Sequence, residues 1–163
     1  MKQDWKTSRR PERARQPFKR IERRLAKTRS LSTTSTISRR MGTVRQRGTS
    51  PELAVRRIVS QLGIRYTLRN RDLPGSPDLA NRTKRFAIFV HGCFWHRHRR
   101  CALTTTPRSN RSFWQAKFVR NVERDRASIR ALRARNFRAV VIWGCEVARD
   151  SLVLKRIRPL GCR

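Results

Sequence analysis

Two short, apolar runs constrain the fold more than any other feature of the chain. Residues 86–90 read Phe-Ala-Ile-Phe-Val and residues 139–143 read Ala-Val-Val-Ile-Trp. A strand that is buried on both faces needs apolar side chains on both faces, so each run predicts a central strand. Such a sheet must be covered on both sides, and the remaining chain has to supply the cover.

Helices are expected before, between and after these strands. A helix is predicted to begin at Thr49–Glu52, with a capping hydroxyl and an early proline, and to end near Gly63. The alternation in residues 64–68 favours another strand. Residues 111–135 predict a long helical stretch in one or two pieces, and residues 151–157 a short helix. The order predicts an α/β fold, a mixed β-sheet flanked by helices.

The charge of the chain indicates a polyanionic partner. Among 163 residues, 42 are Lys or Arg and 10 are Asp or Glu, which gives a formal net charge of +32. Such a charge opposes compaction unless phosphates neutralise it, so nucleic acid is the favoured partner. A basic solvated surface or an anionic membrane surface is the alternative. Residues 1–40 have few apolar side chains and are expected to form a disordered basic arm, with the folded domain at 41–163.

Targeting signals are weak. No run reaches the roughly 18 apolar residues of a membrane span, and the first residues lack the apolar core of a secretory signal. We expect a cytoplasmic, nucleoid-associated bacterial protein that does not bind membranes; a basic transit peptide is the alternative. In that compartment cysteines near histidines indicate a metal site before a disulfide.

Cysteine and histidine concentrate in one segment. All 3 histidines lie between residues 91 and 98, and Cys93 and Cys101 lie close by. Thiolate and imidazole are the ligands that zinc prefers, and a structural site needs four of them. Cys93, His98 and Cys101 can supply three from one loop. The tightness of that loop favours His98 over His96 as the ligand. The alternative is that His91 or His96 is a zinc ligand instead of His98.

A fourth ligand has to come from another part of the chain. Cys145 follows a predicted central strand, whereas Cys162 lies near the chain end, which tends to fray. The sequence therefore favours Cys145. Free cysteines and solvated histidines are the alternative for the whole set.

Other residues in the region could carry catalysis. His91 and His96 are not needed as ligands once the zinc site has four others, and they could act as acid or base near neutral pH. Asp78 follows a proline at a predicted strand start and could hold Mg²⁺. The alternative is a turn or cap residue, which most Pro-Asp pairs are. Glu52 is either a residue that favours the helix start or a carboxylate behind a metal site.

Aromatic residues lie between and beyond the candidate ligands. Phe94 and Trp95 could stack on bases or wedge into a duplex step, and Trp114 is a third candidate. Ordinary packing around the zinc loop is the alternative for all three.

Taken together, these motifs resemble the very short patch repair endonucleases, bacterial enzymes that nick DNA at T:G mismatches. The likeness covers roughly residues 38–145, and the string from His91 to His96 is its most specific part. The markers are Pro51–Leu53, Leu73–Asp78, Phe89–His96, Phe113–Trp114, Asn121–Asp125 and Val141–Cys145.

The resemblance implies a restriction-endonuclease-like core and a Mg²⁺-dependent nick 5′ of the mispaired T, after which a polymerase replaces a short patch. Asp78 and the backbone carbonyl of Val90 would hold Mg²⁺. His91 and His96 would assist at the scissile phosphate, with His96 as the general base, and Glu52 would lie behind this site.

The resemblance also assigns the remaining candidates. Structural zinc would be held by Cys93, His98, Cys101 and Cys145. The side chains that would intercalate beside the mismatch are Phe94, Trp95 and Trp114. The partner would be double-stranded DNA with a T:G mismatch, with mismatch-repair proteins as further candidates. We expect a monomer, since nicking one strand needs one active site.

The sequence departs from related patterns at two places. Position 90 is Val where family members can carry Thr, a change that a backbone carbonyl ligand survives. The apolar run 86–90 also lacks the acidic residue and Lys that usually follow the first carboxylate in restriction enzymes, which favours histidine-assisted chemistry. The alternatives are a non-catalytic zinc-bearing DNA-binding protein and a restriction-type nuclease on the same core.

Overall fold

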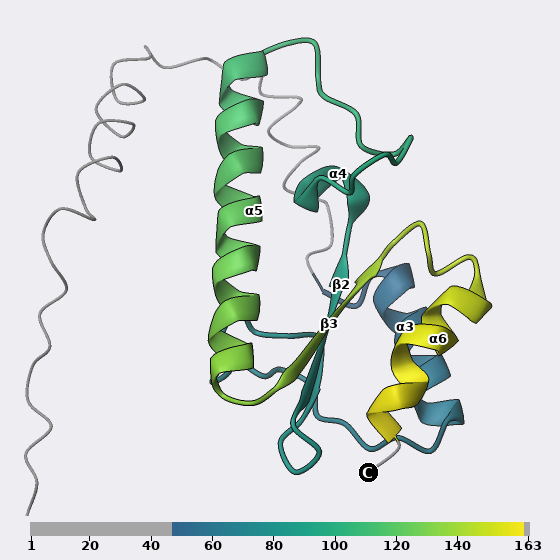
Figure 1. Ribbon diagram of the computed structural model, residues 1–163. Coiled ribbons are helices and arrows are strands. Elements are labelled where there is room, and N and C mark those ends of the chain that lie inside the picture. The colour runs from purple at the N-terminus through teal and green to yellow at the C-terminus, as the bar shows by residue number, and fades with distance from the viewer. Residues whose placement is uncertain (1–46, 162–163) are drawn as a thin grey trace, which may run out of the picture. The chain divides into compact units, whose positions relative to one another are not determined.

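The computed structural model describes residues 47–161 (Figure 1). The predicted arm at 1–40 and Cys162 lie outside the described residues. No helix within 47–161 combines the length and the apolar character that crossing a membrane requires. The elements, in chain order, are α3 (Ser50–Gln61), β1 (Leu79–Asn81), β2 (Phe86–His91), α4 (Cys93–His96), α5 (Arg111–Ala134), β3 (Arg138–Trp143) and α6 (Asp150–Gly161).

The sheet is mixed, as predicted. Its strand order is β1-β2-β3, with β1 antiparallel and β3 parallel to the central strand β2. Leu79 pairs with Ile88, and His91 pairs with Trp143 at the carboxyl ends of the parallel strands. Parallel pairing therefore brings the residues that follow β2 and β3 to the same edge of the sheet.

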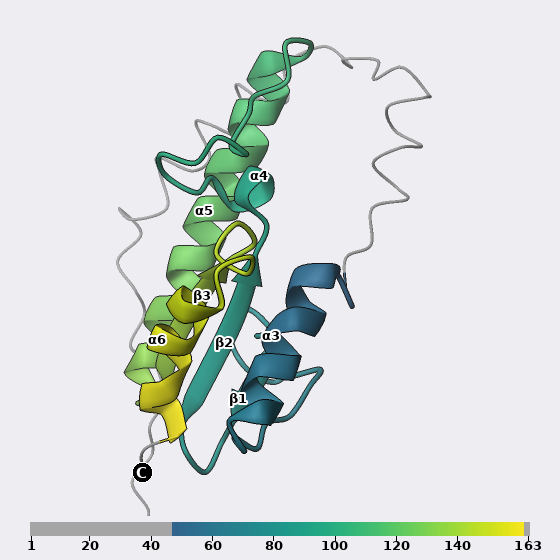
Figure 2. The ribbon, with the colours of Figure 1, turned by 90° about the vertical axis from the view of Figure 1, so that its right-hand side faces the viewer.

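Helices cover both faces of this sheet. Figure 2 shows α3 and α6 in front of the strands and α5 behind them. Phe86 and Ile88 pack against the α3–α6 side, whereas Ala87 and Phe89 pack on the side of α5. Because successive strand residues point to opposite faces, a strand covered twice must be apolar throughout, which explains the composition of β2.

Four local predictions differ from the structure. The run 139–143, predicted as a central strand buried on both faces, lies in β3 at the end of the described strand order, and most of its side chains are half-buried. Residues 64–68 form no strand: Thr67 alone pairs, in an isolated bridge to Ala80, because β1 offers only three residues to a neighbour. The segment Cys93–His96, predicted as a loop, forms the short helix α4. The helix α6 runs to Gly161, beyond the predicted end at 157, because Val153, Ile157 and Leu160 continue its buried stripe.

The start of α3 is closed by a carboxylate. Thr49 is the N-cap residue, but its predicted capping hydrogen bond is wrong, since the hydroxyl donates to Glu52 Oε1 at 3.0 Å. Glu52 Oε2 in turn accepts from the Gly48 N–H at 2.9 Å and from Arg56 at 3.2 Å. Glu52 is therefore buried with three hydrogen-bond partners at the helix start.

Candidate active site and metal centre

The Cys/His segment begins where β2 ends. The His91 carbonyl accepts a hydrogen bond from the Gly144 N–H at 2.9 Å, so the chains leaving β2 and β3 stay together. Cys93 and Cys145 lie just beyond these two residues. The parallel pairing of β2 and β3 thus explains how cysteines far apart in the sequence meet.

Four candidate ligands are gathered at this edge. Atoms able to ligate a metal from these residues all lie within 4.8 Å of one another: Cys93, His98, Cys101 and Cys145. His98 Nδ1 lies 3.2 Å from the Cys145 sulfur and 3.8 Å from the Cys93 sulfur. The set is the one that the sequence favoured, and its two thiol neighbours identify Nδ1 as the nitrogen of His98 that faces the cluster.

The surrounding chain holds this cluster in shape. The Thr104 hydroxyl lies within hydrogen-bond distance of the His98 carbonyl at 2.8 Å and of the Cys93 carbonyl at 3.2 Å. The His98 ring stacks on Trp143, with centroids 4.3 Å apart and planes 9° from parallel. The ring is therefore fixed by β3 on one side and by its own loop on the other.

The chemistry of the donor set fits a divalent metal with a preference for sulfur. Burial first, and crowding by Cys93 and Cys101 next, raises the pKa of Cys145 to about 12. A hydrogen bond from the backbone at Leu103 lowers the pKa of Cys101. Adjacent thiolates repel unless a cation neutralises them, and three thiols with one imidazole match a tetrahedral zinc set. The described cysteines are not joined in disulfides.

Between Cys93 and His98 the chain changes direction. Arg97 ends α4 in the left-handed conformation, with φ 56°. Its guanidinium lies over the Phe118 ring, 4.4 Å from the centroid, and donates to the Thr105 carbonyl at 2.7 Å. His96, before the turn, points to Asp125 on α5, whereas His98, after it, points to the thiols.

The second group of predicted residues lines a separate cavity of about 440 Å³. The predicted catalytic and Mg²⁺-holding residues all contribute to its wall: Glu52, Asp78, Val90, His91 and His96. The structure therefore brings the predicted catalytic residues together and keeps them apart from the Cys/His cluster, although α4 contributes a residue to each group.

The Asp78 carboxyl group has a raised pKa. Its Oδ2 accepts a hydrogen bond from the Val90 N–H at 2.7 Å, which ties β1 to β2. Burial, with a smaller contribution from the Glu52 carboxylate, raises the pKa of Asp78 to about 6. A bound cation would reverse this effect, because positive charge favours the ionised carboxylate.

The two histidines stack on each other. The rings of His91 and His96 lie 3.9 Å apart, 11° from parallel. Burial, followed by the nearby His96, lowers the pKa of His91 to about 4, so His91 is neutral at pH 7. His96 Nδ1 is hydrogen-bonded to Asp125 Oδ2. A carboxylate only accepts, so this contact makes Nδ1 the donor and leaves Nε2 as the other site for a proton.

Sequence reasoning gave Asp125 no role of its own, although this residue ends the family marker Asn121–Asp125. Its carboxylate and the rings of His91 and His96 form a second group of ligand atoms within 4.8 Å of one another. Asp125 lies seven residues after buried Phe118 and seven before buried Leu132. A carboxylate on the buried stripe of an otherwise exposed helix was the signal that could have identified it.

The aromatic residues form one cluster between α4 and α5. Phe94 contacts Trp95, Trp114 and Phe118, all edge to face, and Phe113 contacts Trp114. Trp114 is 6% exposed, whereas Phe94 and Trp95 are half-buried and Phe113 is 42% exposed. The ammonium of Lys117 lies over the rings of Trp95, Phe113 and Trp114.

A cavity lined by carboxylates and two stacked imidazoles, on a strongly basic chain, fits a hydrolase of phosphodiester bonds. The family model described as DNA mismatch endonuclease Vsr matches residues 30–103. The chain belongs to the Vsr family of DNA endonucleases.

Three relatives document the membership. The type II nicking enzyme V.XorIIP of Xanthomonas oryzae is 39% identical over 120 residues, 74% of this chain and 88% of the relative. The DNA mismatch endonuclease Vsr of Escherichia coli is 35% identical over 133 residues, which cover 78% of this chain and 85% of the relative. The type II nicking enzyme V.NmeAIP of Neisseria meningitidis is 33% identical over 128 residues, which cover 78% of this chain and 91% of the relative.

Proposed function

We propose that this endonuclease nicks one strand of double-stranded DNA 5′ of the T in a T:G mismatch, with Mg²⁺, as the first step of very short patch repair. The observation that carries the proposal is the cavity in which Glu52, Asp78, His91 and His96 meet. The mixed sheet between helices is compatible with a restriction-endonuclease-like core, which we include in the proposal. The relative from Escherichia coli carries the name of a mismatch endonuclease.

Asp78 and the backbone carbonyl of Val90 would hold Mg²⁺. Asp78 Oδ2 already accepts from the Val90 N–H, whereas Oδ1 accepts no hydrogen bond within residues 47–161 and is left for a cation. Carboxylate and carbonyl oxygens are ligands that Mg²⁺ accepts. When bound, Mg²⁺ would supply positive charge at the scissile phosphate. Glu52 would stand behind this site and add negative charge, held by Arg56 and the start of α3.

His96 would act as the general base. Its Nδ1–H is engaged by Asp125, so Nε2 carries the lone pair that can take a proton from water. The carboxylate also stabilises the imidazolium that forms when the proton arrives. His91, neutral and stacked beneath His96, would hydrogen-bond at the phosphate without adding charge.

Zinc would be held by Cys93, His98, Cys101 and Cys145 in a structural role. Four protein ligands leave no position for water or substrate, which is the arrangement of a structural site. Because Cys93 begins α4 and His98 follows its end, this site would fix the helix that carries His96.

Phe94, Trp95 and Trp114 would form an aromatic wedge that enters the duplex beside the mismatch. Phe94 and Trp95 are half-buried, so part of their surface is available for stacking on bases. Trp114 packs behind them and would have to move to reach a base itself. The proposal thus divides the aromatic set into two side chains at the surface and one that supports them.

The remaining parts of the proposal concern organisation and partners. Residues 41–163 would form the endonuclease domain, with residues 1–40 as a basic extension. One cavity with one Asp78 is enough for cleavage of a single strand, so a monomer would suffice. Mismatch-repair proteins would be further partners.

The test is a comparison of a T:G duplex with its matched T:A control, with Mg²⁺, on a denaturing gel. A nick 5′ of the T in the T:G duplex alone, lost in Asp78→Ala and His96→Ala while zinc stays bound, supports the proposal. Equal nicking of both duplexes refutes the mismatch part. That result would favour a restriction-type nuclease on the same core, for which the relatives named type II nicking enzymes are the supporting observation.

A further inference from the structure

Asp78 also lines a second cavity. It has a volume of about 620 Å³, and it shares Glu52, Ser76 and Asp78 with the catalytic cavity. The two cavities therefore adjoin along these residues and form one trough that passes Asp78. We call the larger part the arginine trough, after the side chains that line it: Arg47, Arg56, Arg69 and Arg71.

Positive charge dominates this trough. Glu52 pairs with Arg56 at 3.2 Å, which neutralises one of the four arginines. The guanidinium groups of Arg47, Arg69 and Arg71 are exposed and make no ion pair with a carboxylate within residues 47–161. An open cavity with unpaired guanidinium groups attracts phosphate, which arginine binds with two parallel hydrogen bonds.

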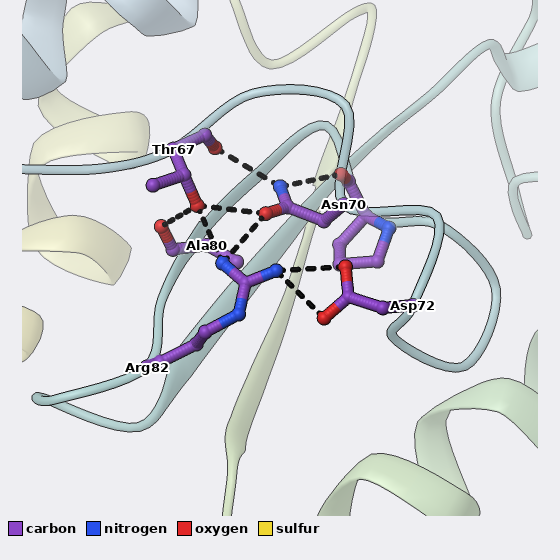
Figure 3. Close-up of polar contacts among 6 residues, drawn as sticks. Thr67, Asn70, Asp72, Ala80 and Arg82 are labelled. Carbon is purple, nitrogen blue, oxygen red and sulfur yellow. Dashed lines mark hydrogen bonds and ion pairs between the residues drawn. The ribbon is translucent and has the colours of Figure 1, made fainter.

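A polar network holds the loop that carries two of these arginines (Figure 3). Arg82 Nη2 donates to both carboxylate oxygens of Asp72, at 2.7 and 2.8 Å. Arg82 Nη1 donates to the Thr67 hydroxyl and to Asn70 Oδ1, at 2.9 and 3.2 Å. Thr67, Asn70 and Asp72 thus converge on one guanidinium.

The same network is joined to the residue before Asp78. Asn70 is 1% exposed, and its Nδ2 donates to the Thr67 carbonyl at 2.9 Å and to the Pro77 carbonyl at 3.1 Å. Buried amides with all their partners satisfied fix the chain around them. The loop that bears Arg69 and Arg71 is therefore tied directly to the segment that places Asp78.

The side chains of this loop divide by function. Thr67, Asn70 and Asp72 are used inside the network, whereas Arg69 and Arg71, between them, line the trough. Arg69 adopts φ 57°, an uncommon conformation for a residue other than glycine. A pre-ordered loop loses little further entropy when its arginines bind, which increases the affinity for a ligand of fixed geometry.

We propose that Arg69 and Arg71 bind the backbone phosphates of the nicked strand next to the scissile phosphate. The inference rests on the proposed function, since it takes the catalytic cavity as the place of the scissile phosphate. Successive phosphates of one strand run through the trough past Asp78, so the contact fixes the register of the strand over the catalytic residues. Phosphate contacts of this kind position DNA and carry no base information.

The experiment combines arginine substitutions with uncharged phosphates. The full chain binds a fluorescent T:G duplex in buffer without Mg²⁺ and without a chelator, so that zinc stays bound and no cleavage occurs. Each phosphate within three nucleotides of the nick is replaced in turn by a methylphosphonate, on either strand. Arg69→Ala and Arg71→Ala should each weaken binding about tenfold, the value of one charged hydrogen bond. The double variant should lower the slope of log Kd against log salt concentration by about 2.

The decisive result is the pattern of positions. The wild type should lose affinity at one or two phosphates of the nicked strand, and the double variant should lose none at those positions, because the partner is already missing. Arg133→Ala with Arg149→Ala removes two exposed arginines that line neither cavity, and it should leave the pattern and the slope unchanged.

Three outcomes would overturn the proposal: wild-type affinity in the double variant, an unchanged methylphosphonate pattern in spite of weaker binding, or sensitivity confined to the complementary strand. With wild-type protein in Mg²⁺, the same duplexes report on nicking. Absence of any nick would refute the proposed function, while the binding measurements without Mg²⁺ would still decide whether Arg69 and Arg71 bind those phosphates.

Discussion

Gly75 lies where the loop before Asp78 approaches α5. Replacing Gly75 with alanine tests whether this close approach positions Asp78 for catalysis. Gly75 has φ 76°, and a Cβ built on it would lie 2.6 Å from Ser128 Cβ and 3.2 Å from the Phe89 ring. Neither neighbour can withdraw easily, because Ser128 belongs to α5 and Phe89 to β2. The loop would have to move, and Asp78 lies three residues further along the chain.

The magnitude follows from two separate contributions. A left-handed conformation costs alanine about 1 to 2 kcal/mol, which the lower entropy of the unfolded alanine chain partly offsets. Overpacking against Ser128 and Phe89 adds about 1 to 3 kcal/mol. Gly75→Ala should therefore destabilise the fold by about 2 to 4 kcal/mol, and at about 4 °C per kcal/mol the melting temperature falls by roughly 8 to 16 °C.

Gly63 supplies the matched control. It has φ 66°, but nothing lies within 4 Å of a Cβ built there, so Gly63→Ala carries the conformational contribution alone, about 1 kcal/mol. The difference in thermal unfolding between the two variants gives the cost of the contacts with Ser128 and Phe89. Displacement of Asp78 is expected in Gly75→Ala only, and a titration of nicking with Mg²⁺ measures it. Equal melting temperatures for the two variants would refute the close approach of the loop to α5.

Three further predictions concern the two candidate metal sites. Cys145→Ser should abolish retention of zinc, measured by elemental analysis of purified protein, whereas Cys162→Ser should keep about one zinc per chain; zinc retained in Cys145→Ser would contradict the ligand set. Asp125→Asn should slow nicking about 100-fold with unchanged DNA affinity, because His96 loses its anionic partner, while Glu123→Gln on the exposed face of α5 should have no effect. Since burial raises the pKa of Asp78 to about 6, protons should compete with Mg²⁺ for this carboxylate below that pH. The Mg²⁺ concentration for half-maximal nicking should therefore rise about tenfold per pH unit below 6. The same Mg²⁺ requirement at all pH values between 5 and 8 would contradict the assignment of Asp78 as a ligand.

Sequence reasoning correctly predicted features that depend on a local run of apolar residues or on two neighbouring strands. The apolar run from Phe86 gave the central strand directly, because burial on two faces leaves no other composition. The meeting of Cys93 and Cys145 followed from two such strands lying side by side. In both cases one local pattern and one general property of sheets were sufficient.

Other features depend on how distant elements pack, and a local sequence pattern does not determine them. Alternation alone predicted a strand at 64–68, but pairing needs a partner of matching length, and β1 has three residues. Asp125 meets His96 only because α5 crosses next to α4, and a helical pattern does not state what a helix lies against. The arginine trough likewise depends on a loop whose shape comes from Arg82, ten residues beyond Asp72.

The left-handed residue Arg97 has a consequence for how this protein can evolve. His96 and His98 serve different groups because a single residue between them reverses the chain. Substitution at Arg97 is conceivable wherever the replacement tolerates positive φ, such as Asn or Gly. An insertion or deletion between Cys93 and His98 would instead rotate one histidine away from its partners. Homologues should therefore vary in residue type at position 97 while keeping the length of this segment constant.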